Sequence, residues 1–324
     1  MARILTGIQS TGTPHLGNIL GAMIPAIEMS THEVNESFLF IANGHSLTQI
    51  KDRNALRVNT YSVASAWLAF GLDPNKTVFY RQTDVNEVFE LSWYLSCNFP
   101  YQRLKLAHSF KDKSENLSDV NAGLFTYPML MAADILLYDA DIVPVGKDQL
   151  QHLEMTRDVA LKINNMYNKE VFVIPESTTL EDTKLIPGTN GKKMSKSHQN
   201  TINIFLGEKE LKKQIMTIQT DTIPLEEPKN PEKCNVFKLY SLLASDSEVA
   251  EMRRKYLEGN YGYGHAKNEL YNLILEQFKD ERKSYNFYME NHQELEKVLS
   301  LGASKAKLVA TQTIDRVRNC FGMV

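Results

Sequence analysis

The sequence predicts an α/β protein: a doubly wound, parallel-sheet (Rossmann-like) domain followed by an all-helical C-terminal domain. Two observations support this prediction. Short apolar runs alternate with segments of helical periodicity in the first half, and from about Leu211 apolar residues recur at helical spacing only. Strands that alternate with helices form a parallel sheet covered on both faces. We therefore expect a first domain at residues 1–195 and a second at residues 196–324.

Apolar runs predict the strands of this sheet. They span residues 3–8, 37–42, 77–80, 141–145 and 171–174. The run at 37–42 is nearly continuous in apolar residues, which is typical of a parallel strand buried on both faces.

The first helix is predicted directly after the first strand, with Leu20, Ile24 and Ile27 on one face. Pro25 lies inside this helix and should kink it, because proline lacks a backbone N–H.

Local signals predict two further helix starts. Asp84 with Glu87 resembles a capping box, which would begin the next helix at that point. Tyr127-Pro128 would begin another helix, since proline is favoured at the first helical position.

Helical stripes follow one another in the second half of the chain. They are formed by Leu211, Ile215 and Ile218, by Val236, Leu239 and Leu243, by Leu270, Ile274 and Phe278, by Leu295, Val298 and Leu299, and by Val309 and Val317.

The composition is that of an ordinary globular protein. Charged residues make up 23% and the formal net charge is −3. The chain therefore lacks the broad excess of basic residues that is typical of nucleic-acid-binding proteins. A local basic face would nevertheless be enough to bind a large RNA. Cys97, Cys234 and Cys320 lie far apart and in no metal spacing, so neither a disulfide framework nor a metal site is expected. We expect a cytoplasmic protein that does not enter the membrane, because the sequence shows no signal-peptide pattern and no apolar run of about 18 residues.

A glycine-rich segment lies between the first strand and the first helix. In this glycine loop (residues 7–18), Gly7, Gly12 and Gly17 would let the backbone approach a phosphate or base closely. The following helix N-terminus favours an anion, and His15 adds a donor. The alternative is a plain turn with an unrelated histidine.

A second segment, residues 192–197, carries three lysines and two hydroxyls in six residues. We call it the lysine loop. Such a cationic loop suits a polyphosphate whose charge shifts during a reaction. The alternative is a solvated run of charge.

Together the two loops resemble the signature motifs of class I aminoacyl-tRNA synthetases. The first reads His15-Leu16-Gly17-Asn18 and departs from the commoner pattern at Asn18, as is usual in the tryptophanyl branch. The second, residues 193–197, matches fully. With the stretch at 122–152, the chain resembles bacterial-type tryptophanyl-tRNA synthetases over essentially its whole length.

Residue chemistry around Asp134 agrees with this resemblance. Tyr127, Met131 and Asp134 lie on one face of a predicted helix. A carboxylate in such surroundings needs a donor, and an indole N–H can only donate. The alternative is an aspartate that bonds a neighbouring backbone or side chain.

The resemblance implies a site in two parts. For tryptophan, Asp134 would read the indole N–H, Tyr127 and Gln149 would hold the amino group, and the ring would be walled by Leu5, Met131, Val143 and Val145, although the family usually has phenylalanine at position 5. For ATP, the lining residues would be Gln9, Ser10, Thr11, His15, Gly17, Asn18, Gly146, Lys147, Asp148, Leu185, Lys193, Met194, Ser195, Lys196 and Ser197, with Asp148 toward the ribose. The residues expected to act in catalysis are Gln9, Lys113, Lys193 and Lys196.

The resemblance also implies the reaction and its partners. The tryptophan carboxylate would attack the α-phosphate of ATP, with Mg²⁺ held mostly by the nucleotide, and the adenylate would pass tryptophan to the 3′ end of tRNA(Trp). The helical domain would bind the anticodon, and the family is homodimeric. Alternatives are a tyrosyl-tRNA synthetase, a small-molecule adenylyltransferase of the same fold, and an inactive paralogue that serves as an RNA-binding module. The intact lysine loop argues against the inactive paralogue, and the helical half argues against the small adenylyltransferase.

Overall fold

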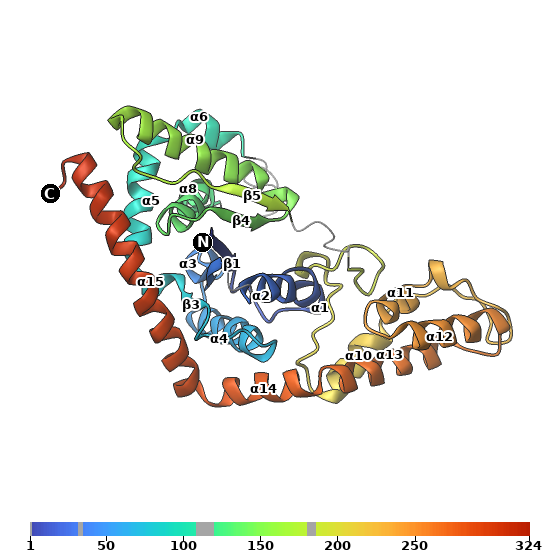
Figure 1. The fold of residues 1–324 in the computed structure, drawn as a ribbon. Helices are drawn as coiled ribbons and strands as arrows, with labels where there is room; N and C mark the ends of the chain where they lie inside the picture. The colour runs from blue at the N-terminus through green and yellow to red at the C-terminus, as the bar shows by residue number, and fades with distance from the viewer. Residues whose placement is uncertain (1, 32–34, 108–119, 180–185) are drawn as a thin grey trace.

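A computed structural model describes residues 2–31, 35–107, 120–179 and 186–324 (Figure 1). Within these ranges a single parallel sheet has the strand order β3-β2-β1-β4-β5. The strands are β1 (Ala2–Ile8), β2 (Asn35–Ile41), β3 (Val78–Arg81), β4 (Ile142–Val145) and β5 (Glu176–Thr179). The chain builds outward from β1 on one side and then continues with β4 on the other side, which confirms the doubly wound prediction.

Both faces of the sheet are covered by helices. Phe38 and Phe40 of β2 pack into one apolar core with α5 (Glu87–Asn98), α8 (Ala122–Leu136) and α9 (Leu150–Tyr167). Leu39 and Ile41 point the other way, into a core shared with α2 (Ile24–Ser30) and α4 (Arg53–Ala69). Alternate residues of one strand thus reach two cores, which explains the continuous apolar run in the sequence.

The first helix is broken in the way that its proline requires. It consists of α1 (Leu16–Asn18), a π-helical turn (Ile19–Met23) and α2. Pro25 cannot donate an N–H to the preceding turn, and the N–H of Ile24 bonds the carbonyl of Ile19, five residues back. The expected kink is therefore a π turn directly before the proline.

The two predicted helix starts are wrong. Asp84 belongs to a 3₁₀ turn (Gln82–Asp84), its carboxylate bonds Arg81, and α5 begins later, at Glu87. Helix α8 begins at Ala122, because the side chain of Asn121 caps the N–H of Leu124, and Pro128 lies inside the helix.

The last strand lies further along the chain than predicted. Val171 and Phe172 are buried but belong to no strand, because Asn164 near the end of α9 bonds their backbone. Its Oδ1 accepts from both N–H groups and its Nδ2 donates to the carbonyl of Phe172. The chain pairs with β4 only from Glu176 onward.

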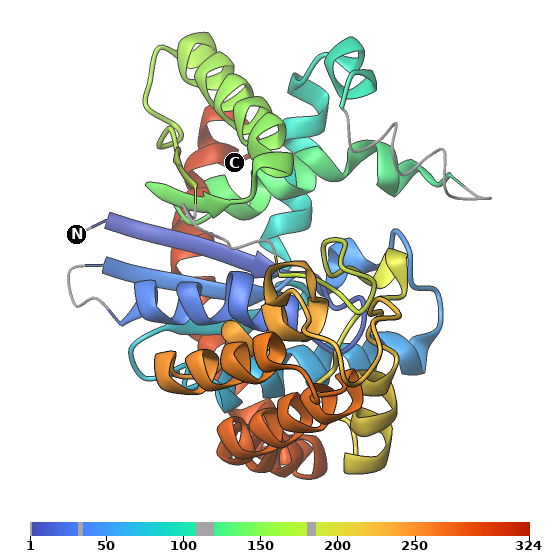
Figure 2. The same cartoon turned by 90° about the vertical axis from the view of Figure 1, so that its right-hand side faces the viewer.

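The second half is helical, as predicted. Its helices are α10 (Glu208–Met216), α11 (Asn235–Ser241), α12 (Asp246–Glu258), α13 (Tyr263–Gln277), α14 (Lys279–Glu290) and α15 (His292–Phe321). Helices α10 to α13 gather on the side of the molecule away from α8 and α9, and α14 leads the chain back (Figures 1 and 2).

Helix α15 packs against the sheet of the first half. A Cβ atom at Gly302 would lie 1.7 Å from the carbonyl oxygen of Phe79 in β3, so the two backbones are in direct contact. Ala303, Ala306 and Ala310 belong to the same apolar core as the sheet. A division at residue 195 therefore does not separate two independent cores.

Candidate functional site

The site lies where the strand order of the sheet reverses. Strands β1 and β4 are neighbours there, and the chain leaves β1 into the glycine loop and β4 into the 3₁₀ turn Lys147–Gln149. In open parallel sheets, ligands bind outside the carboxyl ends of strands at this position.

The glycine loop and the lysine loop line one cavity of about 270 Å³. The lining residues are Ile8, Gln9, Thr11, Gly12, Pro14, His15, Asn18, Val63, Ser195 and Lys196. Two segments about 180 residues apart in the sequence thus face each other across one space. Either loop alone could be a plain turn or a charge run, but their meeting favours a shared anionic ligand.

His15 is held in a defined state at this cavity. Its Nδ1 accepts from the backbone N–H of Asn18 at 3.2 Å. In return, Asn18 Oδ1 accepts from the backbone N–H of His15 at 3.2 Å. Burial, and then the charge of Lys196, lower the pKa of His15 to about 4. The ring is therefore neutral near pH 7, and because Nδ1 accepts, its proton lies on Nε2, which is the ring's donor.

Lys196 reaches across to the glycine loop. A Cβ atom at Gly12, whose φ is +133°, would lie 3.1 Å from the Lys196 Nζ. Although the side chain as a whole stays open to solvent, the burial of its ammonium group lowers the pKa of Lys196 to about 8. A phosphate placed between the loops would reverse this effect, because it supplies the missing opposite charge.

The shape of the lysine loop depends on Asn200, which sequence reasoning missed. Its Oδ1 accepts from the N–H of Ser195 at 2.8 Å, and its Nδ2 donates to Asn190 Oδ1 at 2.7 Å and to the Lys193 carbonyl at 3.0 Å. Asn200 is 1% exposed. It lies three residues past the motif. The sequence alone shows only an asparagine there and gives no sign of its contacts.

Met194 joins the two loops from inside. Its sulfur accepts from the backbone N–H of Gly17 at 3.2 Å, and the side chain is buried. Lys193 and Ser197 stay exposed, with Ser197 bonded to the hydroxyl of Ser195 at 2.7 Å. The structure thus places one lysine of the loop at the cavity and leaves Lys193 in solvent.

Asp134 lies buried in a second part of the site, with two protein donors. His45 Nε2 is 2.8 Å from its Oδ2, and Gln82 Nε2 is 2.7 Å and 3.0 Å from its two oxygens. Burial raises the pKa of Asp134, and the bonds from His45 and Gln82 oppose this rise. We call these three residues the Asp134 cluster.

Asp134 is thus bonded to neighbouring side chains, as in the alternative considered above. It still has room to accept a hydrogen bond from a ligand. A carboxylate offers about four lone-pair positions, and only Oδ2 takes two donors here, so Oδ1 can accept one more. Sequence reasoning missed His45 and Gln82, because they come from different elements with no shared motif.

A chain of hydrogen bonds connects α8 to the end of β4. The Tyr127 hydroxyl lies 3.0 Å from His152 Nε2, and His152 Nδ1 lies 3.0 Å from Gln149 Oε1. Gln149 Nε2 in turn donates to Asp148 at 2.6 Å. The structure therefore joins three of the residues expected at the site through His152, which was not singled out from the sequence.

The other expected residues differ in where they lie. Leu5, Val143 and Val145 are buried on β1 and β4, Met131 is half-buried on α8, and Gly146, Lys147 and Asp148 are exposed at the end of β4. Ser10 is fully buried, and its hydroxyl lies among those of Ser46 and Thr60, so it does not line the cavity. Lys113 and Leu185 lie outside the described residues.

Within the described ranges, no group of three or more His, Cys, Asp or Glu side chains is placed to hold a metal ion. No helix in that part of the chain is both long and apolar enough to cross a membrane.

Known proteins resemble this chain over its full length. A family model described as tRNA synthetases class I (W and Y) matches residues 1–279. The tryptophan–tRNA ligase of Fusobacterium nucleatum is 47% identical over 324 residues, covering 100% of this chain and 99% of the relative. The corresponding ligase of Campylobacter jejuni is 45% identical over 321 residues, covering 99% and 100%. The crystal structure of the Campylobacter jejuni tryptophanyl-tRNA synthetase complexed with ADP and tryptophan matches with a TM-score of 0.95 at 45% identity, over 99% of both chains.

Proposed function

Because this chain belongs to the tryptophan–tRNA ligases, within the class I tRNA synthetases of the tryptophan and tyrosine group, we propose that the cavity and the Asp134 cluster together form its reaction site. There ATP and L-tryptophan react to tryptophanyl-adenylate and pyrophosphate, and tryptophan then passes to the 3′ end of tRNA(Trp). The observation that carries the proposal is that the glycine loop and the lysine loop line one cavity at the point where the strand order reverses.

ATP occupies the cavity between the two loops. His15 donates from Nε2 without adding charge, and Lys196 provides the cation nearest the glycine loop. Because the reaction needs no side-chain nucleophile, orientation of the two substrates and stabilisation of the growing phosphate charge account for catalysis. Lys193 and Lys113 would join Lys196 in neutralising the leaving pyrophosphate.

Tryptophan lies between β1, β4 and α8. The indole N–H donates to Oδ1 of Asp134, and Leu5, Val143 and Val145 wall the ring. The amino group is held by Tyr127 and Gln149, whose orientation His152 fixes. Gly146, Lys147 and Asp148 then face the nucleotide from the end of β4, with Asp148 toward the ribose.

Magnesium would accompany the nucleotide rather than occupy a protein site. Mg²⁺ keeps several waters and binds through phosphate oxygens in such enzymes. The exposed Asp148 is a carboxylate in the proposed nucleotide region.

The tRNA would contact the helices after residue 195, and the anticodon would lie on α10 to α13. These helices present lysines such as Lys209 and Lys213 to solvent on one face of α10, as phosphate binding requires. Residues 1–195, together with the end of the lysine loop at Lys196 and Ser197, would carry the chemistry of adenylate formation.

A homodimer would bury an apolar surface beside the site. Leu47, Phe89 and Trp93 are 50%, 40% and 68% exposed, and the first two line a cavity of about 280 Å³ with Tyr127 and Leu130. Exposed apolar residues gathered in this way are typical of protein interfaces. The cysteines are free, which fits the reducing cytoplasm where tRNA is charged.

Exchange of labelled pyrophosphate into ATP tests the proposal. We expect exchange that depends on tryptophan and is not supported by tyrosine. Exchange with tyrosine alone would make the chain a tyrosyl enzyme. No exchange with either amino acid would fit an inactive paralogue or a small-molecule adenylyltransferase, which needs its own acceptor for the adenylyl group.

A further inference from the structure

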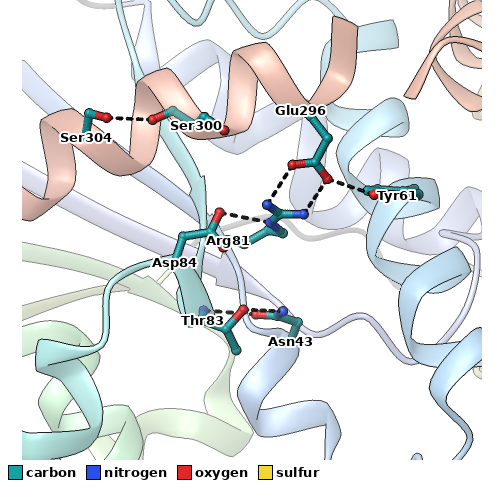
Figure 3. A network of polar contacts seen from close by, with 8 residues as sticks. All are labelled: Asn43, Tyr61, Arg81, Thr83, Asp84, Glu296, Ser300 and Ser304. Atoms are coloured by element: carbon teal, nitrogen blue, oxygen red, sulfur yellow. Dashed lines mark hydrogen bonds and ion pairs between the residues drawn. The ribbon is translucent and has the colours of Figure 1, made fainter. Parts of the chain in front are cut away.

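Three consecutive residues at the end of β3 are each anchored on a different part of the protein, and Figure 3 draws the first and the third of them, Arg81 and Thr83. Arg81 reaches α15, Gln82 reaches the Asp134 cluster, and Thr83 reaches α3 (Asn43–Ser46). This short segment therefore connects the C-terminal helix to the residues proposed to read tryptophan.

Arg81 is fixed by two carboxylates. Its two terminal nitrogens donate to the two oxygens of Glu296 at 2.6 Å and 2.8 Å, and its Nε donates to Asp84 at 2.9 Å. Glu296 also accepts from the Tyr61 hydroxyl at 2.8 Å. A bidentate pair of this kind sets direction as well as distance, because both planar groups must lie in register.

Thr83 is fixed on the opposite side of Gln82. The backbone N–H of Thr83 donates to Asn43 Oδ1 at 3.2 Å, and Asn43 Nδ2 donates to the Thr83 hydroxyl at 2.8 Å. Both neighbours of Gln82 thus have fixed positions, one set by α15 and one by α3 (Figure 3).

Gln82 has little freedom of its own. It is 1% exposed, its Nε2 donates to Asp134, and its Oε1 accepts from the N–H of His45 at 3.3 Å. A Cβ atom at Gly44 would lie 2.7 Å from the same oxygen, so the amide already presses against α3. A displacement of the Gln82 backbone must therefore move the amide that orients Asp134.

Docking of α15 does not depend on Glu296. The helix is also held by Arg318 with Glu90 at 2.6 Å and by Arg316 with Asp139 at 2.5 Å. Its alanine face packs into the core of the sheet. The Glu296–Arg81 pair is partly exposed, and such pairs add little to stability.

We propose that Glu296 is a positioning residue for amino-acid recognition, which acts through Arg81 and Gln82 on the Asp134 carboxylate. The helix that closes the C-terminal half thereby sets the geometry of the tryptophan pocket. The proposal rests on the proposed function, because it takes Asp134 as the acceptor of the indole N–H.

The test compares Glu296→Gln with Glu294→Gln. Both changes remove one carboxylate from the first turns of α15, but Glu294 pairs with Lys297 at the surface. KM values for tryptophan and ATP are measured by pyrophosphate exchange, together with Tm. We expect Glu296→Gln to raise the KM for tryptophan by roughly 2- to 30-fold, the range of couplings relayed through neighbouring residues, with the KM for ATP unchanged. Glu294→Gln should behave as wild type.

A second readout separates positioning from a general loss of structure. Wild type should prefer tryptophan over the analogue whose indole N–H is replaced by sulfur, and Glu296→Gln should weaken that preference. Arg81→Met should do the same, and the double variant should be no worse than either single variant, because both break one link.

Several results would overturn the proposal. These are an unchanged KM for tryptophan, equal rises for tryptophan and ATP, a fall in Tm with the substrate preference intact, or an additive double variant. Failure of the proposed function itself would look different, since the wild type would then show no exchange that depends on tryptophan.

Discussion

Replacement of Asp134 by asparagine isolates the contact that would make this site specific for tryptophan. The change keeps the size of the side chain and one acceptor oxygen. Alanine would instead leave the Gln82 amide and the His45 ring unpaired in a buried place, which costs about 1–3 kcal/mol for each group. The asparagine variant therefore tests recognition with the least disturbance of the cluster.

The expected magnitude follows from the partners of Asp134. A hydrogen bond to a charged acceptor contributes about 1.5–3 kcal/mol, and about 1.4 kcal/mol corresponds to a factor of ten. Wild type should thus prefer tryptophan over the sulfur analogue by roughly 10- to 150-fold. A stronger preference is not expected, because Gln82 and His45 still satisfy the carboxylate when the analogue binds.

The assay is a two-by-two comparison of kcat/KM for two enzymes and two substrates. In Asp134→Asn the preference should fall to within about threefold, which gives a coupling energy of about 2 kcal/mol. A coupling energy near zero would refute the reasoning and would make Asp134 a structural residue, with the preference for tryptophan set elsewhere.

Stability gives an independent check with a definite sign. Burial raises the pKa of Asp134 above its ordinary value of 3.8, so the folded protein binds this proton more tightly than the unfolded chain. The resulting stabilisation is fully present below pH 3.8 and is lost as the pH rises through the raised pKa. Ionisation of this carboxylate therefore weakens the unliganded fold, and Asp134→Asn, whose side chain carries no charge, should not lower Tm at pH 7. A marked fall in Tm at pH 7 would show that the cluster needs the charge.

Four further predictions concern the loops and the helices. Lys196→Ala should slow adenylate formation by roughly 10²-fold or more with little change in tryptophan affinity. Pyrophosphate exchange kinetics would measure this, and a near-normal exchange rate would exclude the role of Lys196. Because the pKa of Lys196 in the unliganded protein is about 8, the KM of wild type for ATP should rise between pH 7 and 9 as the charge is lost, and Lys196→Arg should abolish this rise. Asn200→Asp puts an acceptor against the Lys193 carbonyl and should raise the KM for ATP roughly tenfold at constant KM for tryptophan; equal changes in both would point to general unfolding. Lys209→Glu with Lys213→Glu should weaken tRNA charging in a salt-dependent way and leave exchange intact, and parallel loss of both activities would contradict the division of labour.

The sequence supported the fold well where local pattern and global topology agree. The alternation of apolar runs with helical stripes predicted the parallel sheet, and the glycine loop follows the first strand as predicted, where it lines one cavity with the lysine loop. Local signals failed where a side chain from another segment intervened. Asn121 began α8 before Pro128 could, and Asn164 took the backbone groups of the run at 171–174.

The polar partners within the site could not be predicted for a similar reason. His45, Gln82 and Asp134 come from α3, the end of β3 and α8, and no spacing in the sequence relates them. Only the folded topology brings them within hydrogen-bond distance. The packing of α15 against the sheet could not be predicted either, because its alanines form only a weak apolar stripe. Gly302 disfavours a helix by propensity, and only the structure shows that its missing side chain makes room for the backbone of Phe79.

The close packing of α15 on β3 also bears on how the chain is made. In the described sheet β3 is the outermost strand on its side, and an uncovered outer strand readily pairs with other chains and aggregates. The helix that covers it spans residues 292–321, so it is synthesised only after all five described strands. During synthesis the sheet is therefore complete while its flank stays bare, and chains that stop before His292 should accumulate as insoluble protein.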